Sequence, residues 1–129
     1  MTLGRGMSAE TAEMFARDKE LAQQLWDLLE RARAAEDNLR VERAGASDPQ
    51  RDRELSLELD RALTETMRAA YAAERIAVGP RGYTDWIYRR RQLAKSRVRW
   101  ASRLAERLLT LREEHRLHGI TRVPREVAA

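Results

Sequence analysis

Apolar residues recur along most of the chain at alternating intervals of four and three, the spacing of one face of an amphipathic helix. Ser8 is a suitable N-cap for the first such stretch, and nothing that breaks a helix appears before Gly45. The pattern therefore predicts one long helix from about Ser8 to Ala44. Its inner positions are Met14, Asp18, Leu21, Leu25, Leu28, Ala32, Ala35 and Leu39.

Two further helices follow, and residues that break a helix precede each of them. Residues 45–48 end the first helix, and Asp48 and Pro49 suit the cap and first turn of the next. A second break at residues 79–83, rich in Gly and Pro, separates it from a third helix over residues 84–118, with Thr84 as cap. The expected inner face of the third helix carries Ile87, Ala94, Val98, Ala101, Leu104, Ala105, Leu108 and Leu111.

Three long amphipathic helices with short connections favour an all-α fold. We expect an elongated antiparallel three-helix bundle over residues 8–119, up-down-up, with coiled-coil-like packing. Residues 1–7 are expected to form a flexible N-terminal tail. Residues 120–129 contain Pro124 and no helical continuation, so they are expected to form a flexible C-terminal tail.

The composition removes several classes of protein. The chain has no Cys, which excludes disulfides, thiol nucleophiles and Cys-ligated zinc. No apolar run approaches the roughly 18 residues of a membrane span, so an integral membrane protein is excluded. Because the chain has no Cys and begins without the basic-then-apolar order of a secretory signal, a cytoplasmic location is expected. There is no Gly-rich phosphate loop or nucleophile elbow, and His115 and His118 lack a third metal ligand. We expect a non-enzyme without metal, cofactor or small-molecule substrate.

Charge is concentrated in the third helix. Residues 81–107 hold nine Lys or Arg and two Asp or Glu, a net charge of +7. The guanidinium group of Arg can donate two parallel hydrogen bonds to phosphate oxygens, and nearby aromatic rings can stack on bases. The sequence therefore predicts a non-enzymatic subunit that contacts the backbone of DNA or RNA without sequence specificity, within a larger assembly. The basic residues on the side away from the apolar face are Arg89, Arg91, Lys95, Arg99, Arg103 and Arg107.

A second interpretation makes the chain a protein-interaction module. An Arg-rich helix can be no more than a solvated face, or can meet an acidic protein partner. Trp86, Leu93 and Trp100, seven apart, border the apolar face of the third helix. Such residues belong either to the boundary of the core or to a surface that packs on another chain. On this view the protein is a homo-oligomer, or an assembly protein of the scaffold or inhibitor type found in phages.

Three charged residues break the helical pattern. Arg90 and Arg97 fall on the apolar inner face of the third helix, and Asp18 lies at an inner position of the first helix. Charges buried there must be paired. Parallel first and third helices would bring these residues to similar heights, so we expect Asp18 to pair with Arg97 or Arg90 and to set the register. A buried anion or a subunit contact is the alternative.

Overall fold

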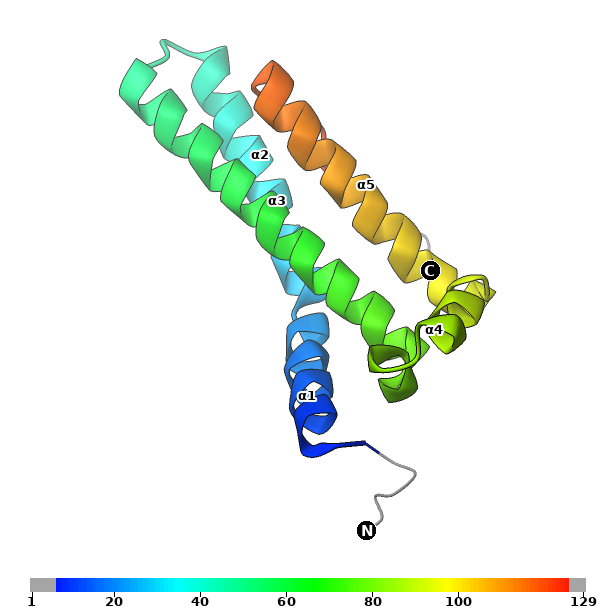
Figure 1. The fold of residues 1–129 in the computed structure, drawn as a ribbon. Coiled ribbons are helices and arrows are strands. Elements are labelled where there is room, and N and C mark those ends of the chain that lie inside the picture. The colour runs from blue at the N-terminus through cyan, green and yellow to red at the C-terminus, as the bar shows by residue number, and fades with distance from the viewer. Residues whose placement is uncertain (1–6, 126–129) are drawn as a thin grey trace. The chain divides into compact units, whose positions relative to one another are not determined.

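The computed structural model describes residues 7–125, and every regular element within that range is helical (Figure 1). The all-α class predicted from the sequence is confirmed. The elements are α1 (Ala9–Gln23), α2 (Leu25–Ala44), α3 (Pro49–Val78), a short 3-10 helix η1 (Pro80–Tyr83), α4 (Trp86–Leu93) and α5 (Ser96–His118).

The helix ends that carry capping or breaking residues lie where the sequence indicates. The Ser8 side chain accepts a hydrogen bond from the Thr11 amide at 3.1 Å, which satisfies one free donor of the first turn of α1. Gly79 ends α3 with a φ of 102°, a conformation that favours glycine. At α4 the cap is Asp85, whose carboxylate accepts from the Tyr88 amide at 3.0 Å, and not the expected Thr84.

The first and third predicted helices are each divided in two, so the prediction of three unbroken helices is wrong. Between α1 and α2, the Gln24 amide donates to the Leu21 carbonyl, three residues back, at 3.0 Å. Between α4 and α5, the Lys95 amide donates to the Gln92 carbonyl, again three residues back. These tight turns interrupt the regular α-helical bonding, although neither contains Gly or Pro. The up-down-up three-helix bundle is accordingly not confirmed.

The chain forms two compact units, each built from two separate stretches. Of the described residues, the first comprises 7–25 together with 68–106, and the second comprises 26–67 together with 107–125. Helices α3 and α5 contribute to both units.

The two cores differ in composition. In the second unit the buried positions are mostly leucines, from α2, α3 and α5: Leu28, Leu29, Leu39, Leu55, Leu59, Leu63, Leu108 and Leu111. In the first unit most are small: Ala69, Ala70, Ala72, Ala73, Val78, Val98, Ala101 and Ala105. Since stabilisation follows the apolar area buried, the leucine-rich unit gains more from each buried side chain. Three expected inner residues, Met14, Ile87 and Ala94, are exposed. For Ile87 and Ala94 the reason is that the division between α4 and α5 changes the helical phase.

Beyond α5 the chain is held against α2. Thr121 and Val123 are buried, so the predicted flexible tail is corrected for residues 120–125; residues 126–129, like the N-terminal residues 1–6, lie outside the described residues. We call residues 119–125 the C-terminal strap. Three arginines of α2 donate to its backbone carbonyls: Arg33 to Pro124 at 2.5 Å, Arg40 to Thr121 at 3.4 Å and Arg43 to Gly119 at 2.9 Å.

A buried carboxylate completes the attachment of the strap. Glu36 of α2 has no solvent exposure. One of its oxygens accepts from the Val123 amide at 2.7 Å and from Arg125 at 2.9 Å, and the other accepts from Arg40. The buried charge is thus compensated by two guanidinium groups and one peptide amide.

Candidate functional site

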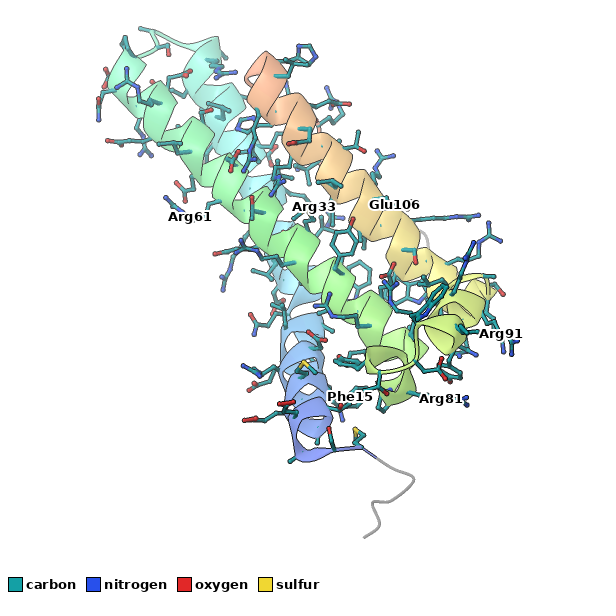
Figure 2. All side chains as sticks on the ribbon, in the orientation of Figure 1. Phe15, Arg33, Arg61, Arg81, Arg91 and Glu106 are labelled. Carbon is teal, nitrogen blue, oxygen red and sulfur yellow. The ribbon has the colours of Figure 1, made fainter. Side chains whose placement is uncertain are left out.

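Most of the predicted basic residues are exposed on the first unit. Five exposed cations from the end of α4 to the middle of α5 form what we call the basic surface: Arg90, Arg91, Lys95, Arg99 and Arg103. Over residues 7–125, none of these five makes an ion pair. Figure 2 shows Arg91 projecting away from the helices. Arg107, also exposed and on α5, belongs to the second unit.

Arg89 differs from the other predicted members. Its Nη2 donates to the buried carboxylate of Glu74 at 3.3 Å, and the Ser102 hydroxyl donates to the other oxygen of that carboxylate at 2.7 Å. Since the Arg89 charge is largely balanced by Glu74, the basic surface does not include this predicted residue.

The predicted pairing of Asp18 with Arg90 or Arg97 is wrong. Asp18 pairs instead with Arg75 of α3, which donates through Nε at 2.7 Å and Nη2 at 2.9 Å, and it also accepts from the Tyr83 hydroxyl. Arg90 is exposed, and Arg97 donates to the Ala77 carbonyl and the Gln92 side chain.

The physical reason for this correction lies in the helix breaks. The prediction extended one helical phase through residues 24 and 94–95, where the structure interrupts it. The spacing of Arg75 and Tyr83 in the sequence does not indicate that they are the partners of Asp18. Their role follows only from the contacts between the helices in the structure.

Burial and hydrogen bonding act on the ionisation of this cluster. Burial would raise the pKa of Asp18, but the hydrogen bonds from Arg75 and Tyr83 outweigh it and lower the pKa below its ordinary value. The pKa of Tyr83 is raised, first by burial and then by its hydrogen bond to Asp18. Tyr83 therefore remains a protonated donor to an ionised carboxylate at neutral pH.

This cluster yields a prediction about pH. Because the folded-state pKa of Asp18 is depressed, its contribution to stability is present above about pH 4 and is lost as the pH falls through the folded-state value. Asp18→Asn should lower the free energy of unfolding by about 1–2 kcal/mol at pH 7, since the partly exposed Arg75 is screened by solvent. Urea unfolding from pH 7 to pH 2.5 should show the difference from wild type shrinking below pH 4. A difference that stays constant with pH would contradict this account.

The predicted interface residues are accessible to different degrees. Trp86 is 67% exposed and Trp100 is 45% exposed, while Leu93 is half-buried. Apolar side chains at such exposure leave part of their surface in contact with solvent. Their role as an interface stays a prediction.

The two histidines of α5 face different surroundings. His115 is buried, and its Nε2 lies 2.8 Å from the Ser56 carbonyl, whereas His118 is exposed. Within residues 7–125 no three His, Asp or Glu side chains are grouped to hold a metal ion. Over the same range no helix has the length and apolar character needed to cross a membrane.

Comparison with known proteins found no matching family model, no matching curated protein and no matching solved structure.

Proposed function

We propose that this protein is a non-enzymatic helical subunit that binds the backbone of nucleic acid through its basic surface, as part of a larger assembly. The observation that carries the proposal is the charge of residues 86–105, which include seven Lys or Arg and no Asp or Glu. Of these seven, Arg89 is balanced by a carboxylate and Arg97 bonds to neutral acceptors. The other five are exposed without an ion pair in the described chain.

The position of these charges on α5 supports an external anion as their partner. The first turn of α5 contains no acidic residue, and it carries Arg97 and Arg99 directly after Lys95. Cations at a helix N-terminus oppose the helix dipole, each by about 0.3–1 kcal/mol. Folding alone therefore disfavours this arrangement, whereas a phosphate at this end would be attracted by both the side chains and the dipole.

The neighbouring residues suit a nucleic-acid ligand in particular. Four of the five members of the basic surface are Arg, whose guanidinium group can donate two parallel hydrogen bonds to a phosphate. The exposed rings of Trp86 and Trp100 lie on the same two helices. Bases of any sequence can stack on such rings, so phosphate contacts and stacking together favour binding without sequence preference.

A salt titration tests the proposal. Binding of fluorescein-labelled single-stranded and duplex oligonucleotides of unrelated sequence should be measured by anisotropy at 50–300 mM salt. If the five cations contact phosphates, log affinity should fall linearly with log salt, with a slope of about −3.5 on single strands and about −4.5 on duplex DNA. Absence of binding at the lowest salt would refute the proposal.

The alternative is a protein-interaction module, favoured by the exposed apolar side chains of α4, Trp86 and Ile87, and by Trp100 of α5. An apolar interface of this kind should be insensitive to salt. Sedimentation equilibrium of the chain alone shows whether it forms a homo-oligomer. An oligomer that persists at 500 mM salt, together with no nucleic-acid binding, would support this alternative, with the basic surface meeting an acidic partner.

A further inference from the structure

A cavity of about 510 Å³ lies within the first unit, among α1, the end of α3, η1 and the start of α4. Its volume is within the range of small-molecule sites, about 300–1,000 Å³. Met14, Val78 and Tyr83 provide apolar lining, and Arg17, Arg75 and Arg89 provide positive charge.

Two of the three guanidinium groups are held in place by carboxylates that leave some donors unused. Arg75 bonds to Asp18 through Nε and Nη2 and also interacts with the Tyr83 hydroxyl, and its Nη1 is not used for Asp18. Arg89 bonds to Glu74 through Nη2, which leaves Nε and Nη1. A donor fixed in advance loses less side-chain entropy when it binds a ligand than a mobile one does.

Arg17 supplies a cation without a partner of its own. It is exposed, and within residues 7–125 it makes no ion pair, although its charge acts on Asp18 over a longer distance. The three guanidinium groups carry +3, and Asp18 and Glu74 carry −2. The cluster is therefore left with one uncompensated positive charge, which one anionic group would balance.

Two glycines keep part of the wall free of side chains. At Gly82 an added Cβ would lie 2.4 Å from Cγ1 of Val78, so no side chain fits without movement. Gly79 has a φ of 102°, which L-residues rarely adopt, and an added Cβ there would meet open space. Both residues line the cavity, so the backbone forms this wall and its amides report directly on an occupant.

We propose that this cavity binds a small organic carboxylate. The carboxylate lies at Arg17 and the unused donors of Arg75 and Arg89, and the apolar body contacts Met14, Val78 and Tyr83. A two-oxygen head matches the fork of a guanidinium group. This inference goes beyond nucleic-acid binding and does not rest on it, because none of these residues belongs to the basic surface.

The test measures binding of two probes to the full chain: the anion 1-naphthoate, and 1-naphthamide, which has the same rings and nearly the same size but is neutral and has only one acceptor oxygen. Calorimetry should show naphthoate binding at least about tenfold more tightly, the equivalent of one charge-assisted hydrogen bond. The amide resonances of Gly79 and Gly82 should shift during a naphthoate titration. Arg17→Gln should weaken naphthoate binding about tenfold, while the matched variant Arg31→Gln, at an exposed arginine of the second unit, should leave it unchanged.

Decanoate is the second carboxylate probe, because it has the same head and a flexible body. The proposal is overturned if neither carboxylate binds at millimolar concentration, or if naphthamide binds as tightly as naphthoate. It is also overturned if the two glycine amides do not shift, or if Arg31→Gln weakens binding as much as Arg17→Gln does. None of these outcomes depends on whether the basic surface binds nucleic acid.

Discussion

Glu36→Gln is expected to lower the free energy of unfolding by about 3 kcal/mol. The two carboxylate oxygens together accept hydrogen bonds from Arg40, Arg125 and the Val123 amide. The Gln side-chain amide has the same shape as the carboxylate but only one acceptor oxygen. Its NH₂ group must therefore lie against one of the N–H donors that now bond to Glu36. The guanidinium groups of Arg40 and Arg125 are about two-fifths exposed and can be hydrated, which keeps the cost at the low end of that for breaking a buried ion pair.

Asp37→Asn is the matched control for this variant. Asp37 is the next residue of α2 and also accepts from Arg125, but its side chain is largely exposed. Loss of the Asp37 charge should lower the free energy of unfolding by less than about 1 kcal/mol. Urea unfolding gives both energies, and hydrogen exchange at the Val123 amide shows whether the strap has detached. Equal effects of the two variants, or unchanged exchange at Val123 in Glu36→Gln, would mean that the buried carboxylate does not hold the strap.

The second large effect concerns the basic surface. Changing Arg91, Arg99 and Arg103 to Glu should weaken nucleic-acid binding by at least about a hundredfold at 100 mM salt. Each lost charge-assisted contact is worth about 1.5–3 kcal/mol, and the introduced carboxylates repel phosphate. The fold should persist, since exposed substitutions away from caps usually change stability by less than about 0.5 kcal/mol. Anisotropy measures the affinity, and circular dichroism with thermal unfolding checks the fold.

The control for the basic surface changes the net charge equally at other exposed arginines. Arg31, Arg61 and Arg68 are exposed and make no ion pair in the described chain. Their triple change to Glu should reduce affinity by less than about tenfold, through the long-range field alone. If the two triple variants lose affinity equally, binding is a response to net charge and this surface is not the site. An unfolded basic-surface variant would show that the three arginines have a structural role.

The fold could be predicted best where the signal is local. Gly, Pro and capping residues act on their own neighbours, so the ends at residues 45–48, 79–83 and 119 were readable from the sequence. The turns at Gln24 and at Ala94–Lys95 contain no residue that favours a break, and one helical phase was therefore carried through them. Burial of the strap also escaped prediction, because it depends on polar contacts with α2, far away in the sequence.

The candidate site shows the same division. Exposure of Arg91, Arg99 and Arg103 follows from helical spacing and charge, which the sequence contains. The partners of Asp18 and Arg89 depend on which helices meet and at what height, and no spacing rule supplies that. No sequence pattern indicates the cavity beside them, because its arginines come from three separate helices, α1, α3 and α4.

The division of both units into two stretches has a consequence for how this protein can be inherited and engineered. Residues 26–67 interrupt the first unit, and residues 68–106 interrupt the second. Neither unit can be cloned as one continuous fragment, and no single crossover between residues 25 and 107 leaves both of them whole. The two units therefore cannot be shuffled as independent cassettes. The two units must therefore be inherited together, mutated together and transferred together into any other protein.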